Sequence, residues 1–225
     1  MRNIAHRGAS AYAPENTTAA FDLAIEMGAD AIETDVQLTR DQHLVLFHDS
    51  KMERTSSGEG KICDYTLAEL QLLDVGAWFG AEFAGARILG LGDALETYLD
   101  RIPFVLEIKD PAAAIPMIEA TPVTDRIEVT SFDWDALIAA KDRVPSFSYG
   151  FLTPRFDDFE IERCVTAGLQ QICPHADVVS IELVVSAHAH GLNVRAWGIS
   201  RPEQIHHLVG SGVDGTTCNW PDWLT

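Results

Sequence analysis

The sequence predicts an α/β protein, a closed (β/α)8 barrel of the TIM type. Eight short apolar segments, each expected to be a parallel strand, alternate with helical segments along the chain. The chain has 225 residues, which is enough for one barrel at the short end of the usual range. Polar residues also recur at or near the ends of the expected strands, where such barrels build their active sites. A doubly wound open sheet is the alternative architecture.

The first elements are a strand at 3–6, a helix at 18–28 and a second strand at 31–37. The helix has apolar residues on one face and ends at Gly28, because glycine readily adopts the left-handed conformation that closes a helix. A further apolar segment at 44–48 follows after only a short turn. Parallel strands need a crossover of a dozen or more residues, so we expect this segment to form an antiparallel hairpin with 31–37.

The stretch from 50 to about 89 is irregular and is expected to be an insertion over the open end of the barrel. It contains a loop at 56–60, a helical patch at 66–73 and an aromatic cluster at 77–80. A helix at 93–100 follows; then strands at 104–109, 127–131, 148–152, 170–173, 193–197 and 215–217 alternate with helices at 112–120, 133–141, 157–167, 181–190 and 202–209. We therefore expect a single domain over residues 1–225, with an insertion at about 50–89.

The composition argues against binding to nucleic acids and to anionic membranes. The formal net charge is −18 and the isoelectric point is near 4.6, which weighs against nonspecific nucleic-acid binding and against docking on anionic membranes. No run approaches the ~18 apolar residues of a membrane span, and the first residues hold no apolar signal core. Cys63, Cys164, Cys173 and Cys218 lack metal-site spacing, so we expect four buried thiols in a cytoplasmic protein. The sequence leaves the oligomeric state open.

Glu33 and Asp35 form an acidic pair on the second expected strand. Because successive side chains of a strand alternate, both carboxylates point to the same face. At about 4 Å and an effective dielectric of ~20, two such charges repel by roughly 4 kcal/mol, which bulk water or a bound cation can relieve. Apolar neighbours argue against a fully solvated strand face. Glu107, beside Lys109 at the end of a later strand, is the third expected ligand of one divalent cation, and carboxylate oxygens suit Mg²⁺ or Ca²⁺ better than zinc.

Two histidines and two basic residues complete the expected site. His6 and His48 follow apolar segments, and a pair of histidines beside a phosphodiester can work as acid and base. One would take a proton from the attacking hydroxyl or water, and the other would protonate the leaving alkoxide. Arg7 and Lys109 supply the local positive charge that an acidic protein needs to bind a phosphate. Trp197, at the end of a later strand, is a candidate wall of the substrate pocket.

Several short motifs occur in a definite order along the chain. They are His6-Arg7-Gly8, Pro14-Glu15-Asn16-Thr17, Glu33-Thr34-Asp35-Val36, His48-Asp49, Arg54-Thr55, Glu107-Ile108-Lys109 and Val194-Arg195-Ala196-Trp197. In this order and spacing the sequence resembles the glycerophosphodiester phosphodiesterase family, from residue 4 to about residue 222. Each motif alone is weakly specific, whereas the ordered set is strongly specific.

The resemblance implies a (β/α)8-barrel enzyme that cleaves glycerophosphodiesters to sn-glycerol 3-phosphate and an alcohol with one divalent cation, Mg²⁺ or Ca²⁺. The residues carried over by position are His6 and His48 as catalytic residues, Glu33, Asp35 and Glu107 as metal ligands, Arg7 and Lys109 as phosphate contacts, and Glu15 as a further polar residue of the pocket. Attack by the substrate's own glycerol hydroxyl, through a cyclic phosphate, and direct attack by water are both open.

Two other functions are open at this point. A lysophospholipase D-type phosphodiesterase, acting on lysolipids at a membrane, would be supported by an apolar rim that includes Trp78 and Phe79. A binding module of the same fold that has lost catalysis is disfavoured, because the acid–base and metal residues are all retained. The sequence departs from the family pattern at Gly198, where Thr is usual, and at Asn219, where Asp is frequent. Both positions follow the last two strands, so they change the polarity expected of the pocket, and we expect neither to contact the acid–base or metal residues.

Overall fold

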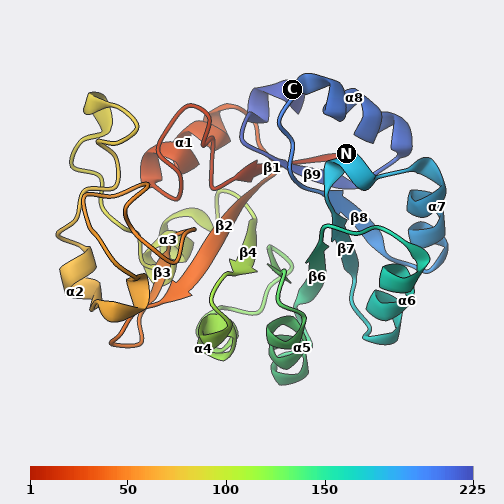
Figure 1. Cartoon of the computed structure of the whole chain (residues 1–225), viewed down its shortest axis with the longest axis horizontal. Helices are drawn as coiled ribbons and strands as arrows, with labels where there is room; N and C mark the ends of the chain where they lie inside the picture. Colours follow the sequence, from red (N-terminus) through yellow and green to blue (C-terminus); the bar gives the residue numbers. More distant parts are fainter. Residues whose placement is uncertain (225) are drawn as a thin grey trace.

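Eight parallel strands close into a barrel in the computed structural model of the chain, which describes residues 1–224 (Figure 1). Around the barrel the order is β1-β2-β4-β5-β6-β7-β8-β9, and β1 pairs with both β2 and β9. These two pairings close the sheet, so the predicted barrel is confirmed and the open doubly wound alternative is wrong. The strands of the barrel are β1 (Arg2–His6), β2 (Ala31–Leu38), β4 (Phe104–Ile108), β5 (Ile127–Ser131), β6 (Ser148–Thr153), β7 (Gln171–Pro174), β8 (Asn193–Ala196) and β9 (Gly215–Cys218).

Helices cover the outside of the barrel (Figure 1). They are α1 (Thr18–Glu26), α3 (Leu91–Tyr98), α4 (Ala114–Ala120), α5 (Trp134–Arg143), α6 (Asp158–Thr166), α7 (Ile181–Ala189) and α8 (Pro202–Ser211). Short polar side chains at Thr17, Asp133, Asp157 and Ser180 each accept a hydrogen bond from the backbone N–H three residues later. These caps fix the helix starts close to their predicted positions. Within residues 1–224, no helix is long and apolar enough to cross a membrane.

The second strand continues beyond the barrel into the predicted hairpin. β3 (Leu44–Leu46) pairs antiparallel with the end of β2. The strand is shorter than expected, although the Phe47 N–H still donates to the backbone oxygen of Asp35 at 3.0 Å. Beyond that point a side chain holds the segment: Gln37 Nε2 donates to the backbone oxygen of Phe47 at 2.7 Å and to that of Asp49 at 2.8 Å. These two bonds fix the backbone on both sides of His48.

The insertion packs on its own small hydrophobic cluster beside the barrel, next to β3 and α1 (Figure 1). Its buried members are Val45, Phe47, Met52, Ile62, Leu70, Val75 and Ile88. The helical patch predicted at 66–73 is only one turn, α2 (Leu67–Leu70), which starts with a capping box between Thr66 and Glu69. The chain then leaves the helix, because Leu73 packs on the cluster and the Asp74 carboxylate accepts backbone N–H groups of the following loop.

The expectation of four buried thiols is wrong at one position. Cys164, Cys173 and Cys218 are buried, whereas Cys63 is exposed, and all four are free. Cys63 lies in a short 3₁₀ turn, η1 (Ile62–Asp64), of the insertion. The preceding side chain, Ile62, is directed into the insertion cluster, so the next side chain points outward.

The interior of the barrel has a thin apolar layer beneath polar residues. Ile4, Ala31 and Val105 form a fully buried cluster there, while the main core lies between the strands and the helices. His6 and Glu33 come two residues after Ile4 and Ala31 and are register partners. Because side chains alternate along a strand, both point into the barrel at its C-terminal end.

A substitution at Gly8 tests whether α1 must pack closely against the loop after β1. Its φ is +82°, and an added Cβ would lie 2.6 Å from the backbone of Ala20. We expect Gly8→Ala to lower the free energy of unfolding by roughly 2–4 kcal/mol, from backbone strain and steric overlap together. Gly85→Ala is the matched control, because Gly85 has a φ of +93° but nothing within 4 Å. Chemical denaturation should show the larger loss for Gly8→Ala; equal losses would assign the whole effect to the backbone conformation.

Candidate active site

Three carboxylates meet at the mouth of the barrel, on β2 and β4. Glu33, Asp35 and Glu107 offer oxygens that all lie within 4.8 Å of one another, and all three side chains are buried. Asp35 and Glu107 are direct register partners, and Glu33 lies two residues before Asp35 on the same face. Glu33 Oε1 and Asp35 Oδ1 have no hydrogen-bond partner among residues 1–224. Buried lone pairs without a partner on a set of hard oxygen donors fit a divalent cation, so the cluster could hold a metal ion.

Burial and mutual repulsion change the acidity of the three groups unequally. Burial, followed by the charges of Asp35 and Glu107, raises the pKa of Glu33 well above its ordinary value. Burial and Asp35 likewise raise the pKa of Glu107. Burial would also raise the pKa of Asp35, but Arg7 and Lys109 outweigh it and hold that pKa below its usual value. Without a cation, protonation is therefore favoured more at Glu33 and Glu107 than at Asp35.

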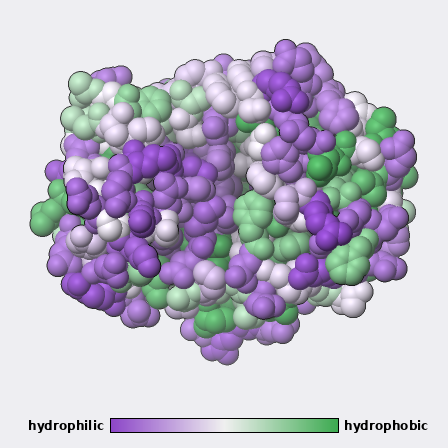
Figure 2. Space-filling model, viewed as in Figure 1, coloured by the Kyte–Doolittle hydropathy of each residue, from purple (hydrophilic) through white to green (hydrophobic). Residues whose placement is uncertain are grey.

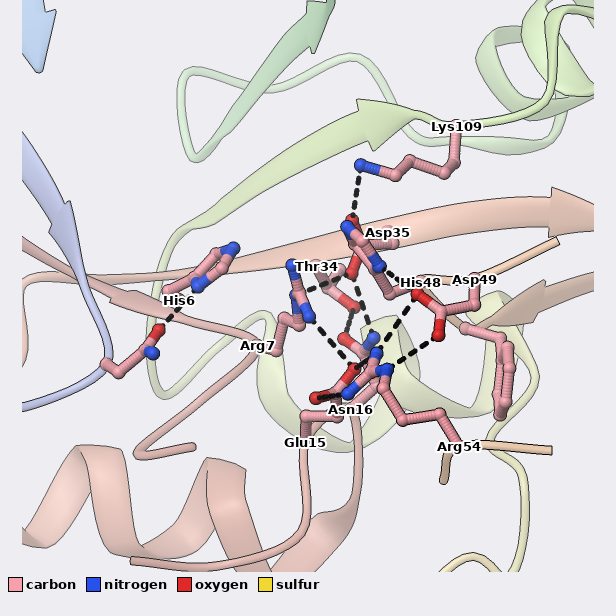
Figure 3. Close-up of polar contacts among 12 residues, drawn as sticks. His6, Arg7, Glu15, Asn16, Thr34, Asp35, His48, Asp49, Arg54 and Lys109 are labelled. Atoms are coloured by element: carbon pink, nitrogen blue, oxygen red, sulfur yellow. Dashed lines mark hydrogen bonds and ion pairs between the residues drawn. The ribbon is translucent and has the colours of Figure 1, made fainter. Parts of the chain in front are cut away.

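Arg7 and Lys109 both lie beside Asp35 (Figure 3). Arg7 directly follows β1 with a φ of +57°, a left-handed conformation that is uncommon for a residue with a long side chain. Its Nε lies 3.1 Å from Asp35 Oδ2, and one terminal nitrogen donates to Glu15 Oε1 at 2.9 Å. Lys109 Nζ donates to Glu107 Oε1 at 2.7 Å and lies 3.6 Å from Asp35 Oδ1. The two cations thus offset the buried negative charge from opposite sides of the cluster.

His6 is the last residue of β1 and lies beside the carboxylates. Its Nδ1 is 2.5 Å from Asn219 Oδ1, which can only accept, so Nδ1 carries the hydrogen and the lone pair is on Nε2. Nε2 lies 3.8 Å from Glu33 Oε2. Burial and the neighbouring Arg7 lower the pKa of His6 to about 3. The imidazole is therefore neutral at pH 7. The expectation that Asn219 would not contact the acid–base residues is wrong, because the side chain that follows β9 reaches the His6 ring.

His48 reaches the same mouth from the hairpin, just before the insertion. Its Nδ1 is 2.5 Å from Asp49 Oδ1, and Asp49 accepts a hydrogen bond from Arg54 Nε at 2.6 Å. Both terminal nitrogens of Arg54 also donate to Glu15, each at 2.8 Å (Figure 3). The hydrogen bond from Arg54, with that of His48, lowers the pKa of Asp49 to about 2. Asp49 is therefore an ionised acceptor for the His48 ring, and Arg54 links it to the loop after β1.

Asn16 anchors that loop to β2. It has a φ of +57°, and its Nδ2 donates to Asp35 Oδ2 at 3.0 Å. Its Oδ1 accepts from the Thr34 hydroxyl at 2.7 Å. Asn16 thus holds one oxygen of Asp35 in place and leaves the other directed toward the cluster.

The site opens into one cleft at the barrel mouth. It contains about 640 Å³ of space, including solvent at its opening. Hydrophilic side chains predominate on the insertion side of the hollow in Figure 2. The opposite wall is apolar and contains Phe132, Leu152, Trp197 and Ile199. Trp197 packs edge-to-face on Phe132, with ring centroids 4.9 Å apart, and its Nε1 donates to the backbone of Cys173 at 3.0 Å.

Most of the residues expected from the sequence come together in this cleft. It is lined by His6, Arg7, Glu33, His48, Glu107, Lys109 and Trp197. Asp35 lies fully buried behind them, and Glu15 contacts Arg7 and Arg54 rather than the carboxylate cluster. Sequence reasoning gave no role to Asn16, Asp49, Arg54 or Asn219. Asn16, Asp49 and Arg54 stand within the recognised motifs, but no local pattern shows that a side chain contacts a residue far along the chain.

The fold and the site together define a class of protein, a barrel hydrolase that acts on phosphodiesters. The chain belongs to the glycerophosphoryl diester phosphodiesterase family, whose family model matches residues 6–223.

Known proteins of this kind resemble the chain over nearly its whole length. It is 57% identical over 237 residues to the Mycobacterium tuberculosis protein named Probable glycerophosphodiester phosphodiesterase 1, with 93% of this chain and 86% of the relative covered. It is 36% identical to the glycerophosphodiester phosphodiesterase of Caldanaerobacter subterraneus subsp. tengcongensis, with 98% and 95% covered. The structure of an Oleispira antarctica phosphodiesterase in complex with the product sn-glycerol-3-phosphate matches with a TM-score of 0.91 and 30% identity, covering 99% of this chain and 94% of that one.

Glu107→Gln tests the carboxylate cluster as a cation site. Mg²⁺ or Ca²⁺ added to metal-stripped protein should raise its unfolding temperature, because the cation binds the folded state. Glu107→Gln keeps the size of the side chain but removes a charged ligand, so it should weaken cation affinity by roughly tenfold or more and reduce the rise. Glu96→Gln, at an exposed position of α3, is the control. A thermal shift in Glu107→Gln equal to that of the wild type would remove Glu107 from the set of ligands.

Proposed function

We propose that the chain is a metal-dependent hydrolase that cleaves glycerophosphodiesters to sn-glycerol 3-phosphate and an alcohol. The observation that supports it most is the convergence of His6 and His48 on a cleft that also contains three carboxylates and two cations. The Oleispira antarctica phosphodiesterase, which shares the fold over nearly the whole chain, carries sn-glycerol-3-phosphate in its structure.

In this proposal Arg7 and Lys109 bind the phosphate. Burial would lower the pKa of Lys109, but Asp35 and Glu107 raise it above its ordinary value, so the amine stays charged. The planar guanidinium of Arg7 can pair with two phosphate oxygens, whereas Lys109 acts as a point charge. A phosphate that enters the cleft would exchange part of their contacts with the carboxylates for contacts with its own oxygens.

His6 and His48 would move the protons. Each ring is held through Nδ1, by Asn219 and Asp49 respectively, which leaves Nε2 for the reaction. One imidazole takes the proton of the attacking hydroxyl, and the other gives a proton to the leaving alkoxide. The attacking hydroxyl belongs either to water or to the glycerol of the substrate itself.

Glu33, Asp35 and Glu107 would hold one divalent cation, Mg²⁺ or Ca²⁺, which carboxylate oxygens suit. When bound, such a cation neutralises the negative charge that develops on the phosphoryl oxygens. Its charge would also allow all three carboxylates to ionise, although burial and repulsion oppose this in Glu33 and Glu107.

Cleavage of lysophospholipids by the same chemistry is the second candidate. Phe132 at the cleft and Trp78 in the insertion are each 41% exposed. Phe79, however, is half-buried and packs edge-to-face against both Trp78 and Phe83, at 5.4 and 5.5 Å between centroids. The exposed apolar rim is therefore smaller than the sequence suggested, which favours a water-soluble diester.

Turnover of glycerophosphocholine tests the proposed function. The protein should release sn-glycerol 3-phosphate in the presence of Mg²⁺ or Ca²⁺, lose this activity in EDTA and regain it when metal is restored. Much faster turnover of lysophosphatidylcholine would favour the second candidate. Failure to release sn-glycerol 3-phosphate with either metal would overturn the proposal.

Two alanine variants test the acid–base pair. His6→Ala and His48→Ala should each lower kcat on glycerophosphocholine by roughly 10²–10⁴-fold with folding intact. A glycerophosphodiester that carries p-nitrophenol as its alcohol needs no general acid, because p-nitrophenolate leaves without a proton. The variant that lacks the acid should therefore regain most of its rate on this substrate, and the other should not. His43→Ala, at the exposed hairpin turn, is the control; near-normal turnover of glycerophosphocholine in either test variant would reject that histidine's role.

A further inference from the structure

Arg195 is a buried cation inside the barrel for which the proposed chemistry has no use. It lies on β8, two residues before Trp197, is only 3% exposed and lines the cleft. One of its terminal nitrogens donates to the Thr217 hydroxyl on β9. Its Nε and its other terminal nitrogen have no hydrogen-bond partner among residues 1–224. Unsatisfied N–H groups of a buried guanidinium are costly, which points to a ligand or water in contact with them.

Thr130 is a second buried polar group without a partner at the same cleft. It is 0% exposed, and its Oγ1 has no hydrogen-bond partner in the part of the chain that the structure describes. Thr130 lies on β5 and is the register partner of Glu107, so its side chain points into the barrel beside the carboxylate cluster. Thr130 and Arg195 both line the cleft and thus offer a hydroxyl and N–H donors to one ligand.

Neutralisation of a neighbouring carboxylate does not explain why a charged Arg195 is buried in the barrel. Burial would lower the pKa of Arg195, but the Cys173 thiol and the carboxylates of Glu128 and Glu33 raise it, so the group stays charged. Within residues 1–224, however, Arg195 forms no ion pair at 4.0 Å or less. The Glu128 carboxylate is instead bound to Arg2 and Gln171. The guanidinium is therefore charged, is held by Thr217 and also interacts with the Cys173 side chain, while its Nε and second terminal nitrogen have no hydrogen-bond partner among residues 1–224.

We propose that Arg195 and Thr130 bind the hydroxyl groups of the glycerol moiety and so select glycerol over smaller alcohols. This inference rests on the proposed function. Arg7 and Lys109 already supply the positive charge for the phosphate beside the carboxylates. Hydroxyl oxygens can accept from the Arg195 N–H groups, and a hydroxyl hydrogen can be donated to Thr130 Oγ1, so a diol satisfies both. A site built to hydrogen-bond a substrate hydroxyl discriminates against analogues without it, because its own buried groups are then unpaired.

The selection can be measured by titrating the Mg²⁺-loaded protein with three monophosphates and comparing their affinities by calorimetry. They are sn-glycerol 3-phosphate, 2-hydroxyethyl phosphate, which lacks the hydroxymethyl group, and methyl phosphate, which lacks all carbon-bound hydroxyls. The wild type should bind sn-glycerol 3-phosphate roughly 10²-fold or more tightly than methyl phosphate, with 2-hydroxyethyl phosphate between them. Thr130→Val, and Arg195→Lys, which keeps the charge but not the fork, should each reduce this preference roughly tenfold by weakening binding of the glycerol compound while leaving methyl phosphate unchanged.

Thermal unfolding distinguishes a variant that has lost ligand recognition from one that has lost protein stability. Thr130→Val removes a buried hydroxyl that has no partner, so its unfolding temperature should equal or exceed that of the wild type. The control is Thr121→Val, since the buried Thr121 hydroxyl donates to the Met117 carbonyl at 2.7 Å, away from the cleft. This variant should unfold at a lower temperature and keep the wild-type preference among the three phosphates.

Each outcome of these measurements either supports or overturns the inference that Arg195 and Thr130 bind the glycerol hydroxyls. Reduced preference in both cleft variants, with methyl phosphate binding retained, supports hydroxyl recognition. Equal weakening of all three phosphates would make Arg195 a phosphate ligand and overturn the inference. An unchanged preference in both variants would overturn it while leaving the proposed function in place. A wild type that neither cleaves glycerophosphocholine nor binds sn-glycerol 3-phosphate would overturn the proposed function and this inference with it.

Discussion

Electrostatic repulsion among three buried carboxylates is the constraint on which the rest of the site depends. Glu33, Asp35 and Glu107 cannot move apart, because strand alternation fixes the first two on one face and the parallel register sets Asp35 opposite Glu107. Charges about 4 Å apart at an effective dielectric of ~20 repel by roughly 4 kcal/mol per pair. The fold tolerates this repulsion because protonation is favoured at Glu33 and Glu107 and because cations surround Asp35.

The loop after β1 supplies much of this compensation through its unusual backbone. Arg7 and Asn16 both have a φ of +57°, and each directs its side chain to Asp35 Oδ2. The tight approach of α1 at Gly8 keeps this loop against the barrel. Conformational strain is common where a structure must present polar groups in one fixed direction, and here that direction is set by the carboxylate cluster.

The insertion is part of the site, although it lies outside the barrel. The hairpin returns the chain to the mouth, and Gln37 holds the backbone around His48 there. Arg54 then joins Asp49 to Glu15, which itself binds Arg7. This chain of charged hydrogen bonds connects the insertion to the β1–α1 loop, so the His48 ring and the Arg7 guanidinium are positioned by one network.

The sequence by itself determined the barrel, the hairpin and the shared face of Glu33 and Asp35, because these follow from periodicity and turn length between near neighbours in the chain. The tertiary structure decided which distant residues meet. His6 and Asn219 are in contact although 213 positions separate them, and Asn219 was visible in the sequence only as a departure from the family pattern. Arg195 and Thr130 likewise line one cleft only because β8 and β5 belong to the same closed barrel. Such contacts depend on strand register and loop conformation, which are set by packing of the whole fold rather than by any local stretch of sequence.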